Sequence, residues 1–192
     1  MLNRVIAVAL RPKDEWPKIA QESTSVAALM MGLVVPLTAI GPICDFLNAM
    51  FFHTRWVIVP PMTWLLAGHI VGYVLTLVGV LVAAFVVEKL APSFQSSGDM
   101  TQALKLVAYA QAPFWAARVL GVLPFLGVLA FFVGLYGLYL AYVGLPFVMK
   151  TPQDKALGFL IVVIVVLIVI WAVIAVISSA IIGFGMVAAG LP

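Results

Sequence analysis

The chain has 192 residues, of which 65% are hydrophobic and 9% are charged, and its formal net charge is +3. So small a charged fraction excludes both a soluble globular domain and a disordered chain. No segment combines dense Lys and Arg with interleaved aromatic residues, so we predict no nucleic-acid partner.

The first 25 residues carry an amphipathic pattern. On a short helix one apolar face would hold Leu2, Ile6, Ala9 and Leu10. Pro12 ends this helix, and a second turn starting at Asp14 would direct Trp16 and Ile19 at the membrane. A basic amphipathic stretch with a Trp is typical of a segment lying at the cytoplasmic headgroups. We favour a simple interfacial anchor over a specific lipid or partner contact.

Five apolar runs follow, at about residues 26–43, 64–87, 104–122, 126–147 and 157–182. A hydrocarbon core about 30 Å thick needs about 20 helical residues at about 1.5 Å each. The third run is marginal, because Gln111, Pro113 and Arg118 interrupt it. Backbone amides in lipid must pair within their own segment, so the runs are expected to be helices. The sequence therefore predicts an all-α polytopic transmembrane bundle, with a cytoplasmic interfacial segment at 1–25 and a five-helix domain at 26–192.

The distribution of Lys and Arg predicts the orientation. The cations on the predicted cytoplasmic side are Arg4, Arg11, Lys13, Lys18, Lys89, Lys105, Lys150 and Lys155. The other side has Arg55 and Arg118. We therefore expect a cytoplasmic amino terminus, an extracytoplasmic carboxyl terminus, and a basic face that contacts anionic lipid headgroups.

Two runs carry stripes of small residues at helical spacing. They are Gly68, Gly72 and Gly79 in the second run, and Gly134, Gly137 and Ala141 in the fourth. Small residues let membrane helices approach closely, so we expect these stripes to pack the bundle. Dimerisation with a second copy through the G-x-x-x-G pattern is a less favoured alternative.

The polar residues of the runs suggest one candidate polar site, made of Asp45, His69, Gln111, Pro113 and Arg118. Pro113 cannot donate a backbone hydrogen bond, which leaves either a simple kink or a polar notch beside Gln111. Arg118 and His69 lie at similar predicted depth. An intramembrane cation needs a partner, or its side chain snorkels to the headgroups. Asp45 is the only acidic side chain predicted on that side, and the carboxyl of Pro192 is the other option.

Catalytic motifs are missing from the sequence. It has no H-E-x-x-H, G-x-S-x-G or Walker pattern, and its two histidines are not spaced as metal ligands. Cys44 is the single cysteine, so an internal disulfide is impossible. We predict a protein that is not an enzyme and that binds no metal or cofactor.

Four segments read YAQAP at 109–113, LPFLG at 123–127, YGLYLAYVGLP at 136–146 and KTPQDKA at 150–156. Together they resemble the core of the Yip family (Ypt/Rab-interacting proteins). The resemblance implies five spans, a cytoplasmic amino terminus and, for eukaryotic members, association with Rab-type GTPases. The long amino-terminal region and the D-L-Y-G-P motif of those members are lacking here, which argues against Rab binding. The short form is similar to bacterial inner-membrane members.

Two functions from different classes fit these observations. The favoured one is a non-enzymatic membrane adaptor that binds lipids or other membrane proteins. The alternative is a small permease or channel that uses the Gln111/Pro113 notch together with His69 and Arg118. A core without a continuous polar cavity would favour the adaptor.

Overall fold

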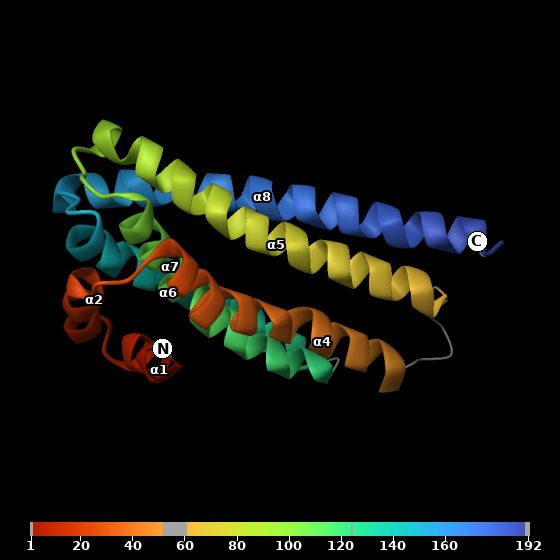
Figure 1. Cartoon of the computed structure of the whole chain (residues 1–192). Coiled ribbons are helices and arrows are strands. Elements are labelled where there is room, and N and C mark those ends of the chain that lie inside the picture. Colours follow the sequence, from red (N-terminus) through yellow and green to blue (C-terminus); the bar gives the residue numbers. More distant parts are fainter. Residues whose placement is uncertain (1, 52–60, 124, 191–192) are drawn as a thin grey trace.

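A computed structural model describes residues 2–51, 61–123 and 125–190 (Figure 1). Helices dominate, and these ranges contain no strand. The predicted all-α bundle is confirmed. Arg55, which the charge analysis placed on the extracytoplasmic side, lies outside the described residues.

Two short helices at the amino terminus fold against the bundle. α1 (Leu2–Leu10) buries Val5 and Val8, while Ile6 and Leu10 of the expected apolar face are 61% and 75% exposed. α2 (Pro12–Gln21) begins with a proline at its first position, where the missing N–H costs nothing. Trp16 and Ile19 of α2 are fully buried in the protein core. Their predicted direction, toward the membrane, is therefore wrong.

The first long helix contains a wide turn that we did not predict. α3 (Val26–Leu29), the π-helical segment η1 (Met30–Val34) and α4 (Val35–Phe51) form one continuous helix. The wide turn ends two residues before Pro36, whose ring would otherwise meet the carbonyl four residues earlier, which lies in the same turn. Tyr73 Oη donates a hydrogen bond of 2.9 Å to the carbonyl of Val35 beside this turn.

Four helical stretches are long and apolar enough to cross a membrane: Val26–Phe51, Met62–Phe94, Gly127–Val148 and Gln153–Ala188. They correspond to α3–α4, to α5 (Met62–Leu90) with η2 (Ala91–Phe94), to α7 and to α8. α6 (Met100–Ala117), which continues as the 3-10 segment η3 (Arg118–Val122), is not among them. The predicted fifth span at 104–122 is therefore not confirmed.

α6 is instead the central helix of the bundle. It touches α1, α2, α3, η1, α4, α5 and α7. Every residue from 103 to 110 is buried, so this part of α6 is enclosed on all sides. A helix that other helices surround does not need the continuous apolar surface of a lipid-facing span. Enclosure by other helices explains why Lys105 is tolerated in it.

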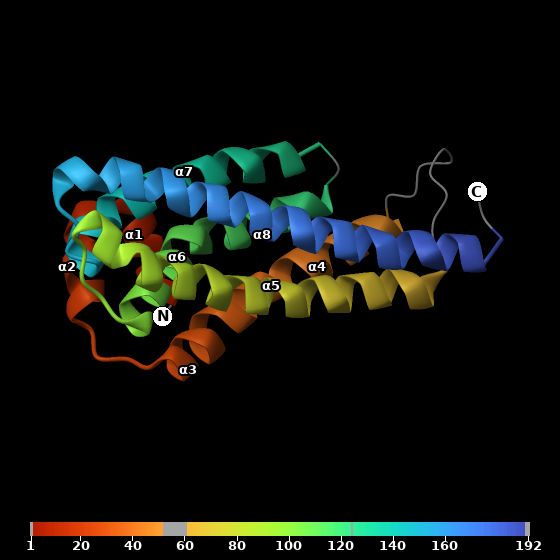
Figure 2. The same cartoon turned by 90° about the horizontal axis from the view of Figure 1, so that it is seen from above.

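The bundle has two different ends (Figures 1 and 2). One end, here called the basic end because the cations of the predicted cytoplasmic side lie there, carries α1, α2, η2 and the turn from α7 to α8. At the opposite, carboxy-terminal end α8 finishes at Ala188. In both views the turn from η3 to α7 stops short of the ends of α5 and α8, so these two helices project beyond it.

Candidate functional site

The basic end is tightly filled around Trp16. Its indole packs edge-on against Tyr109, with ring centroids 6.5 Å apart. A Cβ at Gly144 of α7 would lie 2.6 Å from Trp16 Cε2, so glycine is required for this contact. The neighbouring turns are also joined, since Ser97 N–H donates to the carbonyl of Met149 at 2.8 Å. The contacts of Trp16 with Tyr109 and Gly144 fix α2 to the bundle.

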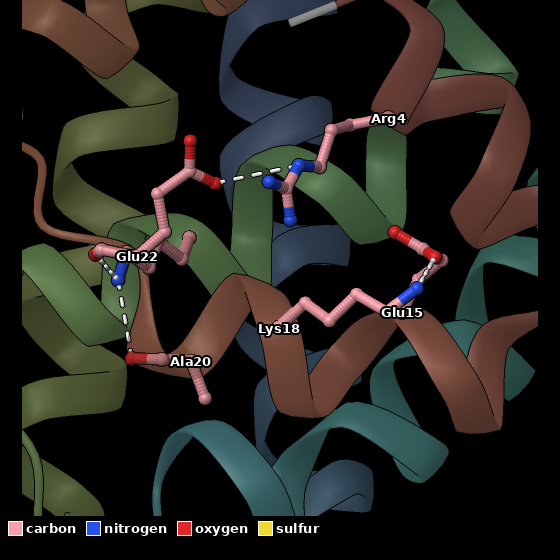
Figure 3. Close-up of polar contacts among 6 residues, drawn as sticks. Arg4, Glu15, Lys18, Ala20 and Glu22 are labelled. Carbon is pink, nitrogen blue, oxygen red and sulfur yellow. Dashed lines mark hydrogen bonds and ion pairs between the residues drawn. The ribbon is translucent and has the colours of Figure 1, made fainter.

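Polar contacts at this end are mostly internal (Figure 3). Arg4 Nε lies 3.5 Å from Glu22 Oε2, and Lys18 Nζ lies 2.5 Å from Glu15 Oε1. Lys105 is 2% exposed, and its Nζ donates to the carbonyls of Glu22 at 2.6 Å and Ala20 at 3.4 Å.

Lys105 therefore cannot contact lipid headgroups, and its prediction as part of the basic lipid-facing surface is wrong. Lys105 lies on α6, outside the four candidate spans. Burial lowers the pKa of its ammonium group, and the negative charges of Glu22 and Asp99 offset part of this lowering. Lysine spacing could not distinguish a buried ammonium from an exposed one.

The other cations divide into two groups. Lys89 and Lys155 lie 3.5 Å and 3.8 Å from the carboxylates of their neighbours Glu88 and Asp154. Among the described residues, no carboxylate lies within 4.0 Å of the cations Arg11, Lys13 and Lys150. The surface available to anionic headgroups is thus smaller than the sequence predicted.

The stripe of α5 packs against α8 within the same chain. A Cβ at Gly68 would lie 2.5 Å from Ile182 Cγ1, and one at Gly79 would lie 2.8 Å from Ile170 Cγ2. A Cβ at Gly72 would lie 2.9 Å from Ser178 Oγ. Because α8 covers this face, the G-x-x-x-G pattern is not available for a dimer.

The stripe of α7 faces α6. A Cβ at Gly137 would lie 2.7 Å from the carbonyl oxygen of Ala110, and one at Gly134 would lie 3.2 Å from Phe114 Cδ2. Ala141 is 9% exposed. The glycines let α7 lie close to the central helix.

Asp45 and Arg118 form an ion pair between α4 and η3. Of the two alternatives for Arg118, pairing and snorkelling, the structure has pairing. Their side chains keep exposed fractions of 39% and 34%, so the pair borders open space. Asn48 fixes the same junction, since its Nδ2 donates to the carbonyls of Gly121 at 3.1 Å and Val122 at 2.8 Å. Sequence reasoning missed Asn48, although it lies one helical turn after Asp45.

Two cavities border this pair. The first, here called the polar pocket, has a volume of about 510 Å³. Its lining is Asp45, Asn48, Phe114, Arg118, Gly121, Gly127, Ala130 and Phe131.

The second, here called the four-helix cavity, has about 350 Å³ and lies among α4, α5, α6 and α8. His69 lines it, although no hydrogen bond to His69 is formed within the described part of the chain. Trp115 Nε1 and Ser178 Oγ, both on residues that line this cavity, are buried without a hydrogen-bond partner among the described residues.

A third space opens sideways between α7 and α8, with α6 as its floor. This lateral groove has a volume of about 510 Å³. The floor consists of Leu106, Val107, Ala110, Gln111 and Phe114. The walls include Gly134, Gly137, Ala141 and Leu145 of α7, and Leu160, Val163, Ile164 and Leu167 of α8. At its rim Phe131 and Ile168 are 61% and 62% exposed, so the groove opens onto the apolar outer surface.

The five residues of the candidate polar site are therefore not in one cavity. Gln111 lies in the lateral groove, and His69 lies in the four-helix cavity. Pro113 lies inside α6, which continues past it as far as Ala117. Arg118 lies at the boundary between the polar pocket and the four-helix cavity. Within the described ranges, no three His, Cys, Asp or Glu side chains are grouped so that they could hold a metal ion.

Comparison with known proteins gives one match. The family model described as Yip1 domain matches residues 6–189, which is nearly the whole chain. No curated protein and no solved structure matches.

Proposed function

The chain belongs to the Yip1 domain family, and from this premise we propose that it is a non-enzymatic integral membrane protein that holds a membrane lipid in its lateral groove. Four stretches long and apolar enough to span a membrane support the setting. The observation that carries the proposal is the groove itself, which is apolar, about 510 Å³ in volume and open on the side of exposed apolar residues.

An acyl chain suits this groove for a physical reason. An apolar space of this kind gains nothing from water, which needs polar partners. Pockets that hold small ligands have volumes of about 300–1,000 Å³, and the groove falls within that range. The close contact of Gly137 with the Ala110 carbonyl fixes the floor and one wall relative to each other. The groove is thus pre-formed, so binding a chain requires little rearrangement.

The permease alternative has weaker support. Its polar groups are divided between the groove and the four-helix cavity. Residues 103–110 of α6 are all buried, so close packing surrounds this part of the central helix. A transport path would need these residues to move apart.

The test compares two neighbouring residues of α8. Ile164 lines the groove, whereas Val165 is 55% exposed on the lipid-facing side and lines none of the three cavities. Ile164→Trp should fill the groove, and Val165→Trp should leave it open. We expect native mass spectrometry of the detergent-purified protein to show retained phospholipid for the parent and for Val165→Trp. Ile164→Trp should retain much less at an unchanged melting temperature. Equal retention in both variants would overturn the proposal.

A further inference from the structure

The lateral groove and the polar pocket are neighbouring parts of one larger site. Both are lined by Phe114 of α6 and Phe131 of α7. A molecule whose apolar part lies in the groove can therefore have its polar part in the pocket without crossing a helix.

The dimensions match one lipid in one leaflet. Leu106 marks the deep part of the groove, and Arg118 marks the pocket. They are 12 positions apart (118 − 106), which is about 18 Å along a helix at about 1.5 Å per residue. One leaflet contributes about half of a hydrocarbon core that is about 30 Å thick. The groove is thus deep enough for the acyl chain of a lipid whose headgroup is at Arg118.

The pocket presents one positive and one negative charge. Arg118 and Asp45 are the charged side chains among the described residues that line it. Both are about one-third exposed or more, so each can accept a second partner in addition to the other. The Asn48 amide is already used by two backbone carbonyls. Space is available because Gly121 and Gly127 carry no side chains: a Cβ at Gly127 would lie 4.0 Å from Gly121 Cα, and one at Gly121 would lie 3.9 Å from Asp45 Oδ1.

This charge pattern distinguishes headgroups. An anionic headgroup would be attracted by Arg118 and repelled by Asp45, with little net gain. A zwitterionic headgroup can place its phosphate beside the guanidinium and its ammonium beside the carboxylate, so that every charge has an opposite neighbour. A primary ammonium also donates hydrogen bonds to a carboxylate, which a quaternary ammonium cannot do.

We propose that the polar pocket selects a phosphatidylethanolamine-type lipid, with the phosphate at Arg118, the ammonium at Asp45 and an acyl chain in the lateral groove. This inference rests on the proposed function, because it requires that the groove holds a chain. It adds the identity of the headgroup and the two residues that recognise it.

The experiment uses the full chain and three lipids with the same palmitoyl-oleoyl chains: phosphatidylethanolamine, phosphatidylcholine and phosphatidylglycerol in equal amounts. Native mass spectrometry counts the lipids that stay bound. We expect the parent to retain phosphatidylethanolamine several-fold over each of the other two, and Ile164→Trp to lose this bound lipid.

Charge variants test the two recognising residues. Asp45→Asn leaves the cation alone and should reverse the preference toward phosphatidylglycerol. The double variant Asp45→Arg/Arg118→Asp restores a neutral pair, so it should restore the preference for phosphatidylethanolamine, and it also controls for misfolding of the single variant.

The outcomes separate the two proposals. Lipid retained by the parent and lost in Ile164→Trp, but without headgroup preference, would overturn the headgroup inference and leave the groove function intact. The absence of any retained lipid in the parent would overturn the groove function and the headgroup inference with it. Unchanged selectivity in Asp45→Asn would overturn the role of the ion pair.

Discussion

The core around Trp16 at the basic end is filled with side chains, whereas the ion pair in the carboxy-terminal half borders two cavities. At the basic end Trp16 is 0% exposed and Lys105 is 2% exposed, and large side chains pack onto glycine. In the other half the ion pair of Asp45 and Arg118 is about one-third exposed and borders two of the cavities. The difference shows where this protein has stability and where it has room for a ligand.

The same residue type serves both ends differently. Gly144 meets an indole that fills the space above it, because Trp16 comes from a separate helix. A Cβ at Gly127 would lie 4.0 Å from Gly121 Cα, and one at Gly121 would lie 3.9 Å from Asp45 Oδ1, so neither glycine is tightly covered by a large side chain. The identity of the facing residue decides whether a glycine makes a contact or a cavity.

The largest effect should come from comparing two tryptophans, one at the basic end and one beside the lateral groove. Trp16→Ala should reduce the free energy of unfolding by about 3–5 kcal/mol, since it removes a fully buried aromatic side chain outside the candidate spans. Trp171→Ala, at a site that is 37% exposed and lines the groove, should cost about 1 kcal/mol through loss of its edge contact with Phe114. Denaturation in detergent micelles measures both. Equal losses would mean that the two halves are equally packed.

A smaller effect is expected within α5 and α8. Gly68→Leu should lower the melting temperature, because the added Cβ would lie 2.5 Å from Ile182 Cγ1 and overpacking costs about 1–3 kcal/mol. Gly183→Leu is the matched control, since nothing lies within 4 Å of a Cβ there, and its melting temperature should not change. If both variants melt like the parent, the contact between α5 and α8 does not depend on this stripe.

The smallest effect concerns the ion pair in the carboxy-terminal half. Asp45→Asn and Arg118→Gln should each destabilise the protein, and the double variant should lose less than the sum of the two. We expect a coupling energy of about 1 kcal/mol, reduced by the partial exposure of both side chains. A double-mutant cycle of unfolding free energies measures it, and strict additivity would show that the pair does not stabilise the fold.

Four of the five predicted runs correspond to helices that are long and apolar enough to span a membrane, because lipid imposes a length and an apolar composition. The runs at 126–147 and 64–87 agree with α7 (Gly127–Val148) and α5 (Met62–Leu90) to within three residues. The run at 26–43 ends too early, because Asp45 and Asn48 interrupt its hydropathy although the helix continues to Phe51. Hydropathy reports what a segment faces, and here two polar side chains face another helix.

The packing of the amino-terminal helices was not predictable from their pattern. An amphipathic helix has an apolar face, but its sequence does not say whether lipid or protein covers that face. Trp16 was expected at the membrane and is covered by α6 and α7. The prediction of the ion pair was limited in a similar way. Counting charges placed Asp45 and Arg118 on the same side of the membrane, but they are in contact only because α4 and η3 are adjacent.

The unequal lengths of the helices have a consequence for the surrounding membrane. α7 has 22 residues, or about 33 Å, which matches a hydrocarbon core of about 30 Å. α8 has 36 residues, or about 54 Å, and would need a tilt beyond the usual limit of about 40° to fit the same core. Its last turns carry exposed Phe184 and Val187, which are costly to place in water. The resulting hydrophobic mismatch acts on one flank of the protein. It is relieved where the bilayer is thicker beside α8 than beside α7, so the protein favours thick membranes or thickens its own surroundings unevenly.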